Sequence, residues 1–201
     1  MFLTAKGDEH TNPTLVIKDH YNGGTWAMMV LRKGTQTTFI TQRVSKIISS
    51  LGYHNVVLKC DQEPAIEELK RDIRTEMLKE LQEAARNVRD QLGGDRISLH
   101  EGGEVPSILI ESSPVGESAA NGVIERAIQS VQEQIRVIKD TIETEADMTL
   151  SPSSSVWPWM IEYAAFTLFA YKIDSNDGLT ALERTRGRTT HQCIVAFGEH
   201  V

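Results

Sequence analysis

The chain of 201 residues has few cysteines, no basic excess and no long apolar run, and each shortage excludes a class of protein. Its two cysteines, Cys60 and Cys193, are too few for a disulfide scaffold, so we expect both to be reduced. The longest apolar stretch, Val156–Ile173, is interrupted by a proline and two charged residues, whereas a bilayer span needs ~20 apolar residues. The formal net charge of −7 argues against a protein that simply coats DNA, because such a surface would be basic.

The composition fits one globular domain with a proper core. Apolar residues make up 40% of the chain and charged residues 24%, which is the balance of a folded rather than a disordered protein. The first residues carry no basic segment followed by an apolar run, so we expect no secretory signal peptide. We therefore expect an intracellular protein that does not bind membranes, with the nucleus as one location open to it.

Apolar spacing and turn residues predict a mixed α/β fold with the sheet in the first half of the chain. The expected strands are 14–19, 25–30, 56–60 and 107–111, with the first two joined as a hairpin through an Asn-Gly-Gly turn. The expected helices are 35–49, 66–92, about 117–144 and 157–171. We expect the charged face of helix 66–92 to be solvated. The bulky core residues expected on the helices are Phe39, Trp159, Tyr163, Phe166 and Phe169.

Two carboxylates stand where metal ligands of a nuclease or strand transferase are typically found. The apolar strand Val56–Cys60 ends directly before Asp61, and Glu125 lies in the first turns of a helix that follows Ser113-Pro114. Carboxylates that share two divalent metals ~3.5–4 Å apart activate a water or a 3′-hydroxyl and stabilise the leaving oxygen. The pattern therefore indicates part of a three-carboxylate site for phosphoryl transfer on nucleic acid.

Three stretches resemble the catalytic core of retroviral and long-terminal-repeat retrotransposon integrases. They are Val57–Glu63, Ser113–Arg126, and Pro158–Ala165 followed by Gly178–Arg184. The resemblance implies an α/β, ribonuclease H-like three-layer fold with a mixed sheet flanked by helices. It implies one domain over residues 1–201, with the first strand truncated and a long helix inserted at about 66–92.

The resemblance also implies a site and its partners. Asp61 and Glu125 would be the catalytic residues and the ligands of Mg²⁺ or Mn²⁺. The partners would be DNA (element ends and target), further copies of the chain and other domains of a polyprotein. The residues implied to contact DNA are Asn121, Gly122, Arg126, Arg136 and Lys139.

The first aspartate of the family pattern has no counterpart among the matched stretches. By the resemblance it belongs just upstream of Met1, so we expect the isolated chain to be inactive. Asp8 lies in a polar, loop-like run, and Asp19 ends the wrong strand. Neither is a good replacement, because catalytic groups must be held to within ~0.5 Å.

Two further departures and two alternative functions stay open. Asp61 and Glu125 are further apart than in the family, and Ala119 and Ala120 stand where the family often has polar residues. One alternative is a non-catalytic nucleic-acid-binding or assembly domain derived from a transposon. The other is a nuclease of the same fold that hydrolyses the RNA of a hybrid.

A short basic segment near the C-terminus has two interpretations. Arg184, Arg186 and Arg188 would form either a phosphate contact or a flexible, solvated tail.

Overall fold

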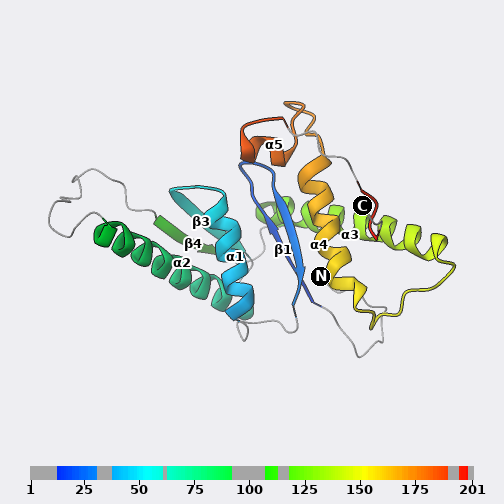
Figure 1. Cartoon of the computed structure of the whole chain (residues 1–201), viewed down its shortest axis with the longest axis horizontal. Coiled ribbons are helices and arrows are strands. Elements are labelled where there is room, and N and C mark those ends of the chain that lie inside the picture. Colours follow the sequence, from blue (N-terminus) through cyan, green and yellow to red (C-terminus); the bar gives the residue numbers. More distant parts are fainter. Residues whose placement is uncertain are drawn as a thin grey trace. The chain divides into compact units, whose positions relative to one another are not determined.

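A computed structural model describes residues 13–30, 38–60, 63–91, 107–112, 118–189 and 195–198. In these ranges the order of elements is β1, β2, α1, β3, α2, β4, α3, α4 and α5 (Figure 1). The chain divides into two compact units. The first combines the described parts of Met1–Arg32 and Ser118–Val201, and the second lies within Lys33–Glu117. Each unit mixes strands and helices, as the sequence predicts.

The first unit contains the predicted hairpin. Strands β1 (Thr14–Lys18) and β2 (Thr25–Met29) pair antiparallel, with Val16 opposite Ala27. In the turn, the Asp19 carboxylate accepts hydrogen bonds from the backbone N–H groups of Tyr21 and Asn22. Gly23 follows with φ of +76°, a conformation that costs glycine little and most other residues more.

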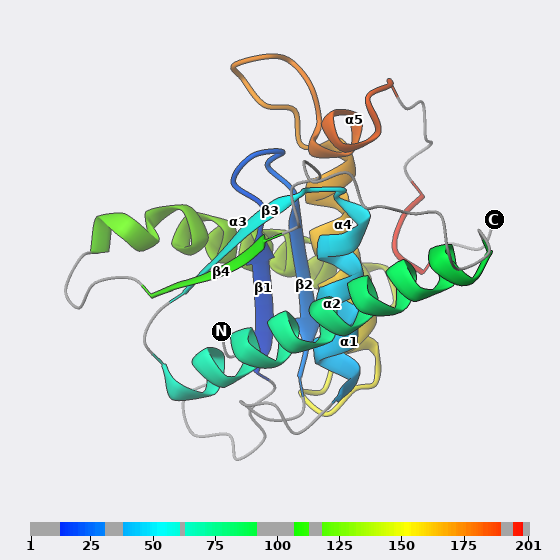
Figure 2. The same ribbon diagram turned by 90° about the vertical axis from the view of Figure 1, so that its left-hand side faces the viewer.

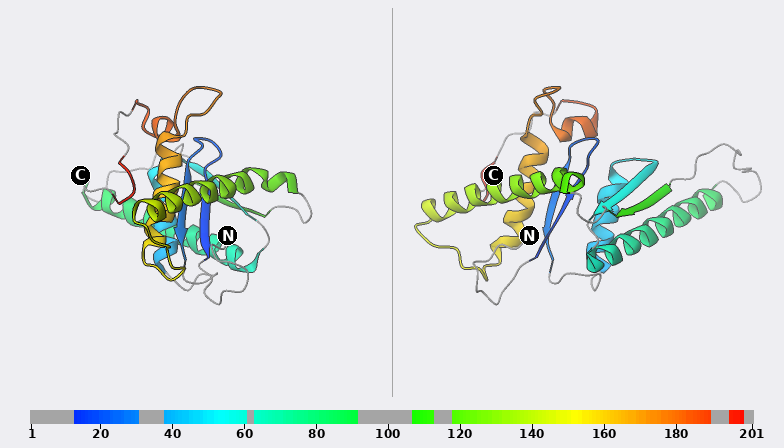
Figure 3. Two further views of the ribbon diagram at one scale, coloured as in Figure 1. Left: turned by 90° about the vertical axis from the view of Figure 1, so that its right-hand side faces the viewer. Right: turned by 180° about the vertical axis from the view of Figure 1, so that it is seen from behind.

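Two long helices build the core of the first unit against this hairpin. Helix α3 (Ser118–Glu145) contacts β1, and helix α4 (Val156–Tyr171) contacts both β2 and α3 (Figure 3). On α3 the buried positions recur at helical spacing, which gives the helix one apolar side. The buried core comprises Ala27, Val131, Ile135, Ile138, Leu150, Trp157, Met160, Ile161, Ala164 and Ala165.

Helix α5 (Ala181–Arg186) is short and is fixed at both ends by its own sequence. Thr180 accepts a hydrogen bond from the Glu183 backbone N–H, and the Glu183 carboxylate accepts one from the Thr180 N–H. This reciprocal arrangement is a capping box, which satisfies two N–H groups at the helix start. Gly187 ends the helix in the left-handed conformation that glycine favours.

The second unit combines a pair of parallel strands with two helices, of which α2 packs against both strands. Strand β3 (Asn55–Cys60) pairs with β4 (Ser107–Ser112), and α1 (Thr38–Ser50) packs against α2 (Pro64–Gln91) (Figure 2). Side chains alternate across a strand, so the two strands have one face toward the helices and one away from them. Ile108 is buried, whereas Val57 and Leu109, paired in the register, are exposed.

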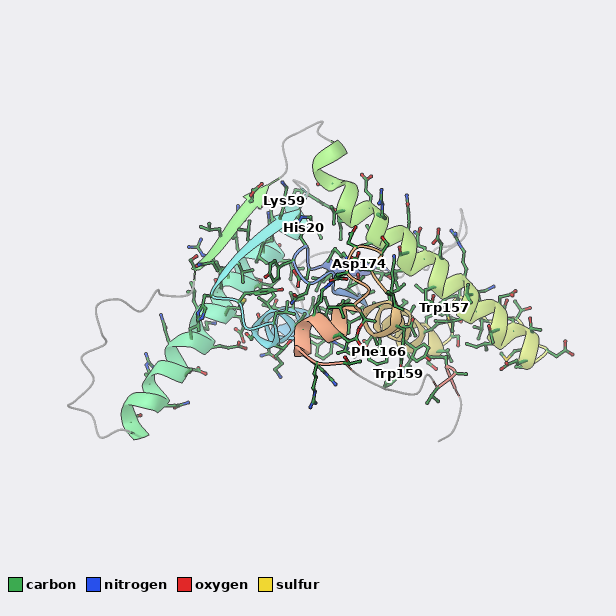
Figure 4. The ribbon with its side chains drawn as sticks, turned by 90° about the horizontal axis from the view of Figure 1, so that it is seen from above. His20, Lys59, Trp157, Trp159, Phe166 and Asp174 are labelled. Carbon is green, nitrogen blue, oxygen red and sulfur yellow. The ribbon has the colours of Figure 1, made fainter. Side chains whose placement is uncertain are left out.

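The prediction of bulky core residues is partly wrong. Trp159 is 71% exposed, and Phe166 and Phe39 are also exposed. Figure 4 labels Trp157, Trp159 and Phe166, which all belong to α4. Because α4 is apolar on nearly every side, periodicity gives no signal for which of its faces is buried.

The predicted strands and long helices are confirmed within one or two residues wherever the structure describes them. The described strands do not form the single mixed sheet that the sequence predicts. The described strands form two separate pairs, β1 with β2 and β3 with β4. In the described part of the chain, no helix combines the length and apolarity needed to cross a membrane.

Candidate nucleic-acid and metal site

Glu125 lies on the outward side of α3, where a metal or a phosphate can approach it. Its side chain is exposed. The buried residues Ala127, Val131 and Ile135 follow it by two, six and ten residues, steps that place them on a different side of the helix. Residues four, eleven and fourteen positions away share its side, since these steps are close to whole turns. The candidate residues Asn121, Arg136 and Lys139 meet this condition, so four predicted site residues form one line along α3.

Gly122 and Arg126, the other residues of α3 predicted to contact DNA, do not share the side of the helix that carries Glu125. Asn121 and Gly122 lie in the first turn and a half of α3, which begins at Ser118. Gly122 lies within the helix, and a Cβ atom added there would meet no atom within 4 Å. Open space at Gly122 is compatible with the approach of a ligand, but no close packing requires a glycine. Arg126 is exposed but points about a quarter-turn away from Glu125.

Lys139 already has a partner within its own helix. Its ammonium lies 2.8 Å from the Glu143 carboxylate, which also accepts a hydrogen bond of 2.7 Å from the Leu150 N–H. The hydrogen bond from Lys139, together with that from Leu150, holds the pKa of Glu143 below its usual value. Lys139 therefore helps to fix the segment after α3, and a phosphate would have to compete with Glu143. Arg136 is exposed on the same side of the helix.

Asp61 itself lies outside the described residues, but its flanks are defined. It directly follows Cys60, the last residue of β3, and precedes Glu63, whose carbonyl accepts the first hydrogen bonds of α2. Pro64 occupies the first position of α2, which suits proline because the N–H there has no partner in the helix. The described residues on the two sides of Asp61 are therefore a strand end and a helix start.

Lys70, a buried lysine that contacts β4, is a residue that the sequence does not single out. Lys70 of α2 is expected on a solvated face, but its side chain is only 5% exposed. Its ammonium donates to the Glu111 carbonyl of β4 at 2.9 Å and to the Glu67 carboxylate at 2.9 Å. On β3, Lys59 pairs with the Glu111 carboxylate at 3.0 Å. The signal was available, because Lys70 stands four residues after Ile66 in the apolar stripe.

The described residues supply a single candidate metal ligand rather than a complete set. Among them, no group of three His, Cys, Asp or Glu side chains is arranged to hold a metal ion. Asp19 is committed to the hairpin turn, which supports the expectation that it does not replace the missing aspartate. Asp8 lies outside the described ranges. An exposed Glu125 carboxylate nevertheless fits the oxygen chemistry that Mg²⁺ and Mn²⁺ prefer.

Arg184 binds carboxylates of its own unit. Its guanidinium contacts Asp177 at 2.6 and 2.8 Å and Asp174 at 3.0 Å, and it donates to the Asn22 carbonyl at 3.2 Å. The hydrogen bond from Arg184 lowers the pKa of Asp177 to about 2, and the two carboxylates raise the pKa of Arg184. Arg184 therefore ties α5 to the β1–β2 turn, and the expectation of a flexible tail is wrong for it. Arg186 and Arg188 are exposed.

Comparisons with known proteins find a likeness of fold. No family model matches the chain, and no curated protein matches it. A chain of the cryo-EM structure of the simian T-cell lymphotropic virus intasome in complex with PP2A regulatory subunit B56 gamma aligns with a TM-score of 0.54 at 11% identity. The alignment covers 95% of this chain and 54% of that one, so the chain spans about half the length of that relative.

The catalytic core domain of bovine immunodeficiency virus (BIV) integrase also aligns. The identity is 15%, the TM-score is 0.44, and the alignment covers 87% of this chain and 85% of that one. From the intasome alignment, the chain has an integrase-like α/β fold.

Proposed function

We propose that the chain is an integrase-type catalytic core, the part of a metal-dependent polynucleotidyl transferase that acts on DNA, and that it is inactive by itself because no residue is assigned to the third carboxylate of the site. The observation that carries the proposal is the exposed Glu125 on the outward side of α3, in a chain whose fold is integrase-like. Asp61 supports it, because this residue follows β3 directly in the sequence. In this proposal the separate strand pairs belong to one ribonuclease H-like mixed sheet, and residues 1–201 form one domain.

Asp61 and Glu125 would hold Mg²⁺ or Mn²⁺, which would supply a metal-activated oxygen nucleophile and charge stabilisation at the phosphate. Around this centre, the exposed side of α3 would carry the DNA. Arg136 lies eleven residues beyond Glu125, which corresponds to ~16 Å along a helix. At that distance its guanidinium would hold a phosphate several nucleotides from the reacting one. Further copies of the chain and other polyprotein domains would complete the assembly.

Metal binding is the first test, because the third carboxylate of the site is not assigned to a residue. The full chain is heated with and without Mg²⁺ or Mn²⁺, beside Asp61→Asn, Glu125→Gln and the control Glu133→Gln. Glu133 is another exposed glutamate of α3. A ligand at 100 times its dissociation constant stabilises the folded state by ~2.7 kcal/mol. We expect this stabilisation in the unsubstituted chain and the control, and its loss in both site variants.

Strand cleavage and joining on a short DNA duplex give the second readout. Where the metal supports product formation, we expect Glu125→Gln to reduce it by roughly 10²–10³-fold, the scale at which a lost catalytic group acts. A chain that is indifferent to both metals contradicts the catalytic proposal. Retained DNA binding would then favour the non-catalytic alternative, and cleavage confined to an RNA–DNA hybrid would favour the nuclease.

A further inference from the structure

Helix α1 exposes an aromatic ring and a cation along one side. The opposite side packs within the second unit, and its buried residues are Ile40, Thr41, Val44, Ser45 and Ile48. The exposed residues recur at steps of three, four and three, which is the spacing of one helix face. This outer side of α1 consists of Phe39, Gln42, Lys46 and Ser49.

The charge of α1 differs from that of the rest of the chain. Of the five described helices, α1 alone contains no aspartate or glutamate, although the chain has a formal net charge of −7. Its charged residues are Arg43 and Lys46. In the described part of the chain, no carboxylate forms an ion pair with Lys46. Glu80 of α2 accepts a hydrogen bond of 3.4 Å from Ser49, so it marks the C-terminal limit of this cationic surface. The outer side of α1 therefore favours an anionic partner.

Phe39 adds a ring on which a flat group can stack. The Arg43 guanidinium lies over this ring, 5.9 Å from its centroid. The Phe39 side chain is nevertheless 62% exposed, so Arg43 covers only part of it. Surfaces that hold single strands of nucleic acid combine these two features, because aromatic rings stack on bases and cations follow the phosphates. In a duplex the neighbouring base pairs cover each base, so the ring fits an unpaired base.

We propose that the outer side of α1 binds a single strand of nucleic acid, with one base stacked on Phe39 and one phosphate held by Lys46. The two residues are seven positions apart, which corresponds to ~10.5 Å of helix. At ~3.4 Å per nucleotide, this length spans about three nucleotides. An acidic peptide would also pair with Lys46, but it would offer no base to the exposed ring.

This site goes beyond the proposed function and does not depend on it. It lies on the second unit and uses neither Glu125 nor the residues of α3. Binding through a ring and an ammonium group requires no metal, so it is measured in EDTA. A chain without catalytic activity would therefore leave this proposal intact, and a failure of binding here would leave the metal test unchanged.

The first test measures the affinity of the full chain for a short, fluorescently labelled thymidine strand by fluorescence anisotropy. We expect Phe39→Ala to raise the dissociation constant by roughly 5- to 150-fold, the scale of one lost stacking contact. Phe39→Tyr keeps the ring and should retain binding. The control Phe166→Ala removes a phenylalanine of α4 that is 43% exposed, and it should change nothing. Circular dichroism verifies the fold, and Phe39→Leu replaces the alanine variant if that variant unfolds.

The second test separates the base from the phosphate. A strand of the same length without bases keeps the phosphates, so it should bind more weakly, and Phe39→Ala should weaken it no further. Lys46→Gln should reduce the slope of log affinity against log salt by ~0.7, the value for one phosphate contact on a single strand. Phe39→Ala should leave this slope unchanged. The control Lys79→Gln, at a lysine of α2 that is 64% exposed, should also leave it unchanged.

Single-stranded DNA and RNA share this chemistry, and a uridine strand beside the thymidine strand shows which of them binds more tightly. Four results would overturn the proposal. They are no binding to either strand, tighter binding of a duplex, an effect of Phe39→Ala that is as large on the strand without bases, and equal effects of the controls. Binding of an oligoglutamate as tight as that of the strand would assign the surface to acidic peptides and would also overturn it.

Discussion

Replacing the buried Lys70 by methionine should destabilise the second unit far more than the same replacement at an exposed lysine. The ammonium of Lys70 donates two hydrogen bonds of 2.9 Å, to Glu67 and to the Glu111 carbonyl, from a side chain that is 5% exposed. Methionine keeps the aliphatic packing but removes both donors. The substitution therefore isolates the polar contribution of this residue.

The magnitude follows from what each acceptor loses. Breaking a buried ion pair by removing one partner costs ~3–5 kcal/mol. Glu67 is one-fifth exposed, so water recovers part of that loss, while the Glu111 carbonyl is left without this donor. We expect Lys70→Met to lower the free energy of unfolding by about 2–4 kcal/mol. With a denaturant dependence of ~2 kcal/mol per molar urea, the midpoint falls by about 1–2 M.

The assay is urea unfolding followed by far-ultraviolet circular dichroism, with Lys79→Met as the matched control. Lys79 is on the same helix, is 64% exposed and lies 3.8 Å from Glu76. An exposed pair of this kind contributes little, so the control should change stability by less than ~0.5 kcal/mol. If the two variants lose the same free energy of unfolding, the buried hydrogen bonds of Lys70 contribute no more than an exposed pair, and the reasoning is refuted.

Three further predictions concern the first unit. Asp177 has a folded-state pKa of about 2, below its ordinary 3.8, so its pairing with Arg184 adds stability above pH ~3.8 that is lost as the pH falls toward 2. The difference in urea stability between the unsubstituted chain and Asp177→Asn should therefore shrink over that range, and a constant difference would contradict the assignment. Met160→Ala should cost ~2–5 kcal/mol in the same assay because Met160 is fully buried, and a loss below 1 kcal/mol would mean that the core refills the space. Without metal, Glu125→Gln should change stability by less than ~0.5 kcal/mol, since its side chain is exposed, and a larger loss measured in EDTA would assign it a structural role.

The sequence predicts the elements of the fold well because local signals determine them. Apolar spacing and turn residues place β1, β2 and the long helices α2 and α3 close to their observed bounds. Helix α5 is not among the predicted helices, although the capping box of Thr180 and Glu183 that begins it is a local signal of the same kind. A helix stripe also places Asn121, Glu125, Arg136 and Lys139 on one side of α3, because this relation depends only on the helix repeat.

Relations between elements are decided by tertiary packing. The sequence does not reveal that Trp159 is exposed and Trp157 buried, because α4 is apolar all round and its neighbours select the buried face. It also does not reveal that Arg184 donates to the Asn22 carbonyl in the β1–β2 turn, because Asn22 lies far from Arg184 in the sequence.

Lys70 shows the difference most clearly. Its type predicts a solvated position, its spacing predicts a buried one, and only the acceptors supplied by Glu67 and the carbonyl of Glu111 decide between them. The sequence by itself thus determined the local helices and strands. It also identified Asp61 and Glu125, the carboxylates from which a metal site is proposed. The tertiary structure decided which charged side chains are already paired, because a charge can be buried only where the fold brings it a partner.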